Sequence, residues 1–227
     1  MLLTIPNVLS TESVRAIRDQ LDQEQWQEGS VTAGGVARRV KHNQQLSTDS
    51  IGYPDLANRV LDAVNSNLLF VSATLPKKIF TPNFNQYQQG GSYGAHVDGS
   101  LMQMAGKQQL LRTDVSSTLF LTDPEEYSGG ELRIETQYGS QEIKLAAGEM
   151  VIYPATSLHQ VAPVEHGSRI ASFFWTQSLI RDSTRREQLF ELDQSIQSLT
   201  QQLGAEHRDV TRLSGIYHNL IRQWAET

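Results

Sequence analysis

The chain has no cysteine among its 227 residues. Disulfide bonds, thiolate metal sites and cysteine nucleophiles are therefore excluded, and histidine and carboxylate side chains are left as the candidate metal ligands. Long apolar runs are also absent, and the first ten residues lack the basic segment and apolar stretch that mark a secretory signal. We therefore expect a soluble protein with a cytoplasmic location.

Basic residues are also few. Lysine and arginine number 19 against 25 aspartate and glutamate residues, which gives a formal net charge of −6. A field of this sign does not attract nucleic acid or an anionic membrane, so we expect neither as a partner. The apolar fraction of 38% is low but compatible with the core of one sizeable domain.

Two helices are expected in the N-terminal part of the chain. Ser10 or Thr11 can cap a helix that runs to about Trp26, with apolar residues on one face. Pro54 opens a second helix of the same kind. Both patterns are amphipathic, which indicates helices that cover one side of a sheet.

The middle of the chain, from Leu68 to Ser178, has short β-rich runs separated by turns that contain glycine. The expected strands span residues 69–74, 79–87, 95–97, 116–121, 131–136, 142–145, 150–153, 160–163 and 170–176. Many short strands at this spacing favour a sandwich or jelly roll over a βαβ sheet. Neither a P-loop nor a dinucleotide-binding glycine motif is present in the required context.

The last 45 residues or so return to a helical pattern. Thr184 and Glu187 fit a capping box, and Gly204 ends the first helix. Apolar residues recur at spacings of three and four on both sides of this glycine, which predicts a helical hairpin. The hairpin either seals itself and packs on the β core, or uses one face to form a homo-oligomer.

Three side chains form a candidate metal site. His96 and Asp98 are two apart in an expected strand, so they point to the same face. A second histidine, His159, follows a turn and a buried strand far along the chain. Two histidines and one carboxylate on one face of a metal, with coordination positions left open, are typical of non-haem Fe(II) oxygenases.

Arg169 lies ten residues beyond the second histidine, at the start of a mostly apolar strand. An arginine that enters a buried strand needs an acidic partner. A bound dicarboxylate supplies one, because guanidinium binds carboxylate through two parallel hydrogen bonds. We therefore expect Arg169 to hold an anionic co-substrate.

These residues belong to a series of motifs that follow one another in the chain. The motifs are Tyr87-x-x-Gly90-x-x-Tyr93-x-x-His96-x-Asp98, Phe120-Leu-Thr-Asp, Ser128-Gly129-Gly130-Glu131-Leu132, and Gly148-Glu-Met-Val-Ile-Tyr-Pro with the following Ser157-Leu158-His159, Pro163-Val164 and Gly167-x-Arg169. In these motifs the chain resembles the Fe(II)- and 2-oxoglutarate-dependent dioxygenases of the prolyl hydroxylase type. Over its full length it resembles the bacterial PKHD-type hydroxylases associated with iron uptake.

The resemblance implies a mostly β fold with flanking helices, built on a double-stranded β-helix (jelly-roll) core. It implies Fe(II) on His96, Asp98 and His159, and 2-oxoglutarate held by Arg169 with help from Tyr87. O2 would be the second co-substrate, and L-ascorbate is an accessory reductant in this family. The expected domains are an oxygenase domain at residues 1–178, with its core at about 79–178, and a C-terminal helical hairpin at 179–227.

Two other functions fit the same residues. A cupin-like metal enzyme uses this ligand geometry without 2-oxoglutarate, and a non-catalytic sensor of iron or 2-oxoglutarate would bind without turnover. The substrate is not specified, and a small molecule and a peptide fit equally well. The loop from Gly99 to Asp114 is expected to cover the mouth of the site, since long loops often act as lids.

Overall fold

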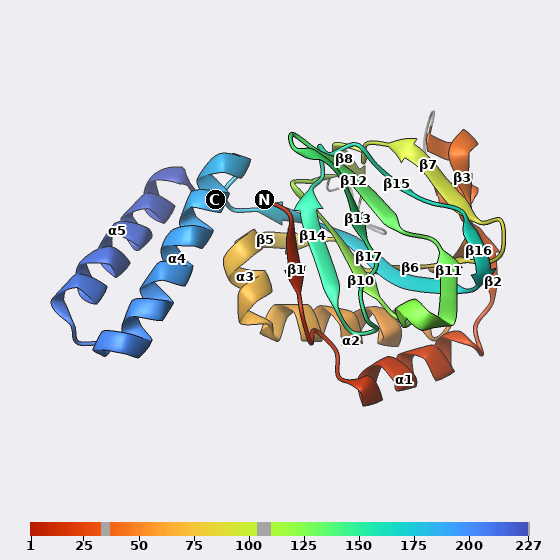
Figure 1. Cartoon of the computed structure of the whole chain (residues 1–227), viewed down its shortest axis with the longest axis horizontal. Helices are drawn as coiled ribbons and strands as arrows, with labels where there is room; N and C mark the ends of the chain where they lie inside the picture. Colours follow the sequence, from red (N-terminus) through yellow and green to blue (C-terminus); the bar gives the residue numbers. More distant parts are fainter. Residues whose placement is uncertain (33–36, 104–109, 227) are drawn as a thin grey trace.

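The computed structural model describes residues 1–32, 37–103 and 110–226. Two antiparallel sheets face each other in this part of the chain and form the β core (Figure 1). In spatial order, the eight-stranded sheet consists of β1 (Leu3–Ile5), β14 (Met150–Pro154), β10 (Val115–Phe120), β17 (Arg169–Ser178), β6 (Asn83–Tyr87), β4 (Gln44–Leu46) and β2 (Trp26–Glu28), with β5 (Pro76–Ile79) also paired to β17.

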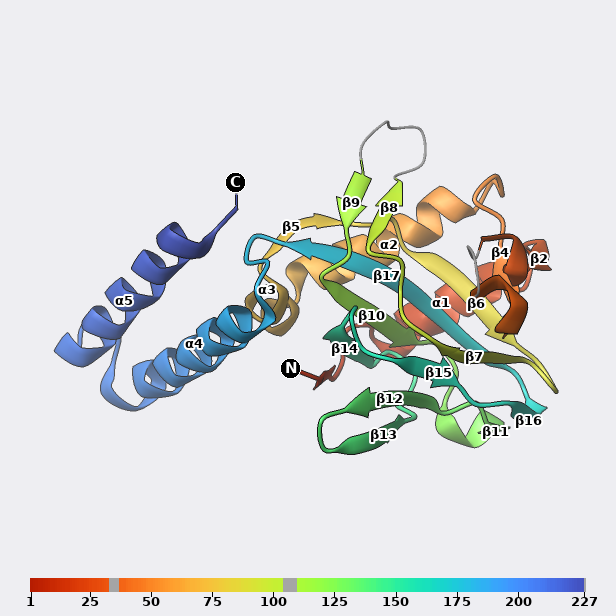
Figure 2. The same cartoon turned by 90° about the horizontal axis from the view of Figure 1, so that it is seen from above.

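The second sheet carries five strands among the described residues. Their order is β13 (Gly139–Ile143), β12 (Leu132–Thr136), β15 (His159–Val161), β7 (Ser92–His96) and β3 (Lys41–His42). Two strand pairs complete the fold, namely β11 (Tyr127–Gly129) with β16 (Val164–Gly167) and β8 (Leu101–Gln103) with β9 (Leu110–Arg112). The β8–β9 pair protrudes from the core (Figure 2). The expected jelly-roll architecture is therefore confirmed.

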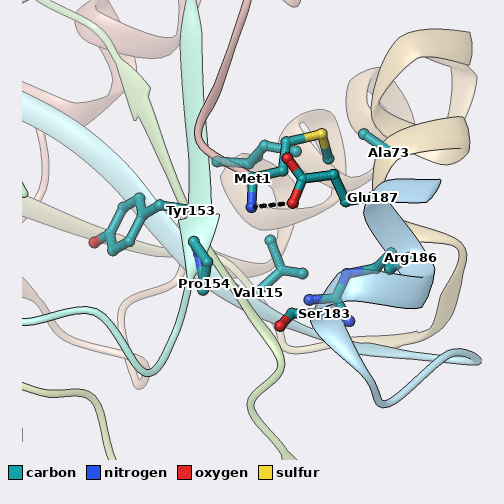
Figure 3. A pocket seen from close by; sticks show the side chains of 9 residues that line it. Met1, Ala73, Val115, Tyr153, Pro154, Ser183, Arg186 and Glu187 are labelled. Carbon is teal, nitrogen blue, oxygen red and sulfur yellow. Dashed lines mark ion pairs between the residues drawn. The ribbon is translucent and has the colours of Figure 1, made fainter. Parts of the chain in front are cut away.

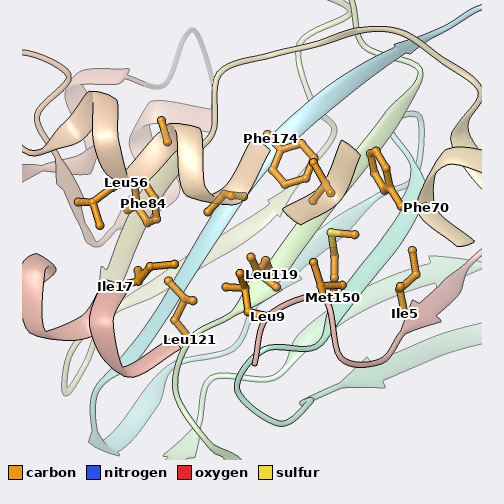
Figure 4. Packing of buried hydrophobic residues seen from close by; sticks show 14 of the residues in the cluster. Ile5, Leu9, Ile17, Leu56, Phe70, Phe84, Leu119, Leu121, Met150 and Phe174 are labelled. Atoms are coloured by element: carbon orange, nitrogen blue, oxygen red, sulfur yellow. The ribbon is translucent and has the colours of Figure 1, made fainter. Parts of the chain in front are cut away.

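The main hydrophobic core lies between the eight-stranded sheet and the helices α1 (Thr11–Leu21), α2 (Tyr53–Ser66) and α3 (Leu68–Thr74), as Figure 4 shows. In strand β17, alternate residues face the helices and the space between the two sheets. Ile170 and Phe174 point into this helix-covered core, and the ring of Phe174 meets that of Phe70 edge-on at 6.1 Å. Because strand residues alternate in direction, Arg169 and Phe173 point to the interior between the sheets.

Three expectations about secondary structure are wrong. Residues 69–74 form helix α3 and not a strand, because the Asn67 side chain accepts a hydrogen bond from the backbone N–H of Phe70 at 2.9 Å and caps the helix. Helix α1 ends at Leu21, since residues 22–25 offer no apolar side chain to continue its buried face. The run 79–87 is divided between β5 and β6 by Pro82, which has no N–H to donate.

The expected C-terminal hairpin is present as α4 (Ser183–Leu203) and α5 (Arg208–Trp224), which pack against each other and extend away from the β core (Figure 1). Asp182, and not Thr184, caps α4, because its side chain accepts a hydrogen bond from the Arg185 N–H at 2.8 Å. Gly204 ends α4 as expected. Helix α4 packs on α3, which favours attachment to the core; the homo-oligomer stays a prediction.

Further contacts join the hairpin to the core near its two ends. In a pocket between the N-terminus and α4, the Met1 ammonium group pairs with Glu187 at 3.3 Å (Figure 3). Beyond α5, the carboxylate of Glu226 accepts a hydrogen bond from Arg112 of β9 at 2.8 Å, and its backbone carbonyl accepts one from Lys77 of β5 at 3.0 Å. None of the described helices combines the length and the apolar character that crossing a membrane requires.

We predict that Phe174→Ala lowers the free energy of unfolding by about 3–5 kcal/mol, because it leaves a cavity between the sheet and the helices. The change is measured by urea unfolding followed by circular dichroism. Tyr138→Ala is the control, since this side chain is 87% exposed and its loss should be nearly neutral. Equal unfolding midpoints for the two variants would contradict this view of the core.

Candidate functional site

The structure brings His96, Asp98 and His159 together at the inner face of the five-stranded sheet. The expectation that His96 and Asp98 share a strand is wrong, because β7 ends at His96 and Asp98 lies in the segment that follows it. His96 ends β7 and His159 begins β15, and the two are directly opposite each other in the antiparallel pair. One ligand atom from each of the three residues lies within 4.8 Å of the others, and His159 Nε2 is 3.8 Å from Asp98 Oδ1. Ligand atoms bind a transition metal at about 2 Å, so one ion fits among them after small side-chain movements.

Backbone carbonyls fix the orientation of both imidazoles. The Nδ1 atom of His96 lies 2.8 Å from the Gly94 carbonyl oxygen, and that of His159 lies 3.0 Å from the Ser157 carbonyl oxygen. A carbonyl oxygen only accepts hydrogen bonds, so each Nδ1 carries the proton and each Nε2 keeps its lone pair for a metal. Both rings are therefore held in the tautomer that a metal requires.

Asp98 is oriented by Ser116 of β10. The Ser116 hydroxyl donates a hydrogen bond to Asp98 Oδ2 at 2.5 Å, while the other carboxylate oxygen faces His159. The carboxylate thus spans the space between the two sheets, with one oxygen fixed and one available. This contact was not predicted from the sequence, because it joins a residue just beyond the end of β7 to a residue of β10 in the other sheet.

The protonation state of His96 also suits metal binding. Burial lowers the pKa of His96, and the nearby His159 lowers it further. The pKa therefore falls below its usual value near 6.5, and the ring is neutral at neutral pH. A neutral imidazole offers a lone pair without first losing a proton.

Arg169 lies in the interior at the other end of the site. It is 1% exposed, and its guanidinium carbon lies 5.4 Å from the ring centre of Tyr87 and 4.9 Å from that of Phe120. Its Nε and Nη2 atoms have no hydrogen-bond partner, and no carboxylate in the described part of the chain lies within 4.0 Å of it. A buried charge with free donors is costly, so this position fits an anionic ligand.

Tyr87 and Arg169 are cross-strand neighbours in β6 and β17. A second tyrosine, Tyr127, was missed from the sequence; its hydroxyl is buried without a partner, and the charge of Arg169 opposes the rise in its pKa that burial causes. Gly130 makes room for this cluster: a Cβ there would lie 3.1 Å from the Tyr127 ring and 3.2 Å from the Arg169 side chain. The conformation of Gly130, with φ at +69°, also favours glycine.

Tyr153 packs beside the candidate metal site. The ring of Tyr153, on β14, meets that of His159 edge-on at 5.1 Å, so this buried side chain covers one side of the candidate metal site.

In the loop from Gly99 to Asp114, Met104 and Lys107 lie outside the described residues. The described part of that loop forms β8 and β9, and a role as a lid stays a prediction.

Comparison with known proteins identifies two segments. Residues 82–177 match the 2OG-Fe(II) oxygenase superfamily, and residues 182–226 match the PKHD-type hydroxylase C-terminal domain. The chain is 51% identical over 225 residues to a PKHD-type hydroxylase of Acidovorax ebreus, covering 99% of both chains. It is 52% identical to one of Pseudoalteromonas atlantica, again covering 99% of both chains.

Solved structures agree in fold. The viral collagen prolyl hydroxylase of Paramecium bursaria Chlorella virus-1, crystallised with 2-oxoglutarate, aligns with a TM-score of 0.54 at 17% identity, covering 78% of this chain and 96% of its own. HygX from Streptomyces hygroscopicus, with nickel, 2-oxoglutarate and hygromycin B bound, gives 0.53 at 11% identity, covering 79% and 84%. At these identities the likeness supports the double-stranded β-helix and nothing finer.

We predict that Ser116→Ala weakens Fe(II) binding by about 10–100-fold, because Asp98 loses the hydrogen bond that orients it. Anaerobic titration of the metal-free protein with Fe(II) measures this loss. Ser117→Ala is a matched control, since the neighbouring hydroxyl is also buried but points to the other face of β10. An unchanged affinity in the Ser116 variant would show that the hydrogen bond does not position the carboxylate.

Proposed function

The chain belongs to the PKHD-type hydroxylases, which are 2-oxoglutarate-dependent dioxygenases, and we propose that it hydroxylates a C–H bond of a substrate that is still to be identified. One atom of O2 enters the substrate as a hydroxyl group, and the other enters succinate. 2-Oxoglutarate loses CO2 in the same reaction. The atoms of substrate, 2-oxoglutarate and O2 are then all accounted for in the hydroxylated product, succinate and CO2.

In this proposal His96, Asp98 and His159 hold Fe(II). The observation that carries it is the convergence of three inward-facing side chains whose remaining polar atoms are already bound, to Gly94, Ser116 and Ser157. Two nitrogen ligands and one carboxylate leave coordination positions open, which is the donor set that suits Fe(II) in oxygenases. The residues therefore fit the metal that the family uses.

Arg169 is proposed to bind the distal carboxylate of 2-oxoglutarate, with the hydroxyls of Tyr87 and Tyr127 beside it. Its unpartnered Nε and Nη2 atoms support this role, because a carboxylate accepts two parallel hydrogen bonds from a guanidinium. Burial raises the pKa of Tyr87 to about 12, so its hydroxyl keeps the proton and remains a donor. The pocket thus offers positive charge and hydrogen-bond donors to an anion.

Bound iron and 2-oxoglutarate would supply the activation of O2. The protein itself contributes orientation and the exclusion of water. Hydrogen bonds from the two imidazoles to backbone carbonyls, and from Ser116 to the carboxylate, restrict how these three side chains can turn. Buried Phe120, Val151 and Tyr153 line the interior around them, which keeps water away from the reacting groups.

The family resemblance extends the proposal to L-ascorbate as an accessory reductant and to a role in iron uptake or homeostasis. A cupin-like enzyme that does not use 2-oxoglutarate is less well supported, because it would leave the buried guanidinium of Arg169 without a ligand. A non-catalytic sensor would bind 2-oxoglutarate but would not form succinate.

We predict that Asp98→Ala abolishes succinate formation, because the metal loses one of its three protein ligands. The assay measures succinate in the presence of Fe(II), 2-oxoglutarate and O2. Asp62→Ala, which alters an exposed carboxylate on α2, should retain the wild-type rate. Undiminished succinate from the Asp98 variant would refute the metal assignment.

We predict that Arg169→Ala weakens 2-oxoglutarate binding by about 2–5 kcal/mol, because a charged, bidentate contact is lost. Affinity is read from the anaerobic charge-transfer band that requires both Fe(II) and 2-oxoglutarate. Arg133→Ala is the control, since this arginine lies on β12 and pairs with Glu142 at the surface. If the Arg169 variant keeps its affinity, the distal carboxylate is bound elsewhere.

A further inference from the structure

A second buried cation lies in the interior, away from Arg169. Lys41 of β3 is 5% exposed, and it lies opposite Tyr93 in the pairing of β3 with β7. Its Nζ atom donates a hydrogen bond to Gln45 Oε1 at 3.1 Å. Lysine is rarely buried to this extent in proteins, and neither the metal site nor the proposed 2-oxoglutarate site uses this residue.

Two aromatic rings lie near the ammonium group. Lys41 Nζ lies 5.5 Å from the ring centre of Tyr93 and 5.7 Å from that of Phe173. Trp175 meets Phe173 edge-on at 5.7 Å, and Phe80 meets Trp175 at 5.5 Å. We name Phe80, Phe173 and Trp175 the aromatic wall.

The aromatic wall is not part of the protein's core packing. All three side chains are half-buried, and none belongs to either hydrophobic core cluster of the described residues. Partly exposed aromatic side chains beside a buried charge are the lining expected of a ligand site, where apolar surface gives affinity and a few polar groups fix orientation.

This cation lies close to the candidate metal site. The Tyr93 ring stacks on the His96 ring with centres 3.6 Å apart, so the same ring lies beside both Lys41 and a candidate metal ligand. Burial lowers the pKa of Lys41 to about 8, and the Asp98 charge opposes that shift. The ammonium form is thus present at neutral pH, although burial makes an additional anionic neighbour favourable.

Lys41 and Arg169 mark different ends of the interior. Arg169 and Phe173 are four residues apart on β17, which corresponds to about 13 Å along a strand. The guanidinium lies over Tyr87 and Phe120, whereas the ammonium lies over Tyr93 and Phe173. A dicarboxylate bound at Arg169 therefore leaves the Lys41 end for a second ligand.

We propose that Lys41 and the aromatic wall bind the primary substrate, and that this substrate carries a carboxylate on an aromatic or similarly flat apolar body. The proposal rests on the function proposed above and adds the chemical class of the substrate. Lys41 pairs with the carboxylate, while Phe173 and Trp175 contact the apolar body. The reacting C–H bond then lies between this anchor and the metal ligands.

The test uses 4-fluorobenzoate as the probe and 4-fluorobenzamide as its neutral counterpart. Fluorine NMR line widths are measured anaerobically on the full-length protein with saturating 2-oxoglutarate, which occupies the Arg169 end. The Fe(II) form is compared with a Zn(II) form, because only high-spin Fe(II) broadens the signal of a probe bound near it. The wild-type protein should broaden 4-fluorobenzoate in the Fe(II) form and leave 4-fluorobenzamide narrow.

Lys41→Met should weaken binding of 4-fluorobenzoate by about tenfold or more, because one charged contact is lost. Lys41→Arg keeps the positive charge and should retain most of the binding affinity. Phe173→Ala should weaken binding of the probe as well. Lys77→Met is the matched control, because Lys77 is an exposed lysine on β5 and its loss should leave binding of the probe unchanged.

Three results would overturn the proposal. The first is that the wild-type protein causes no metal-dependent broadening of the 4-fluorobenzoate signal. The second is that the Lys41→Met variant broadens this signal as much as the wild-type protein does. The third is that the Lys41→Met variant binds 2-oxoglutarate more weakly, which would make Lys41 a ligand of the co-substrate. The charge-transfer band of the wild-type protein, which requires both Fe(II) and 2-oxoglutarate, distinguishes failure of the proposed substrate class from failure of the proposed function. A missing band rejects the function, whereas a normal band with no bound probe rejects only the substrate class.

Discussion

The antiparallel pairing of β7 with β15 is the constraint on which the candidate site depends. It sets His96 directly opposite His159, so two residues 63 positions apart in the chain present their rings to the same space. The second sheet then supplies Ser116 to orient Asp98. Neither sheet builds the site alone, and the helices α1, α2 and α3 matter to it because they hold the eight-stranded sheet in shape from its other face.

Electrostatics complements this geometry. The interior between the sheets contains two buried cations, Arg169 and Lys41, and the carboxylate of Asp98. Two aromatic rings lie near each cation, which provides some compensation for lost hydration. An interior of this kind is completed by a metal ion and anionic ligands, and it distinguishes this protein from a β-sandwich whose core is only apolar.

The sequence was sufficient to predict the β core, the flanking helices and the cluster of His96, Asp98 and His159, because the motif spacing can be read along the chain. The strand alternation that was expected to align His96 with Asp98 does not apply, since Asp98 lies beyond the end of β7. Helix α3 was predicted as a strand because its short apolar run has no clear period, and the Asn67 cap decides the outcome. Tyr127, Ser116 and Lys41 were not recognised as neighbours of the site. Their positions depend on which strands pair, and single-sequence patterns do not specify that pairing.

The C-terminal hairpin is less well anchored by buried side chains than the β core to which it is attached, especially in α5. Leu189 and Phe190 anchor the first half of α4, whereas in α5 only Val210 is buried among the described residues. Few buried contacts mean a small free energy for local opening. The backbone amides of α5 should therefore exchange with solvent deuterium sooner than those of β10 and β17, and α5 should open while the anchored first half of α4 and the oxygenase core remain folded.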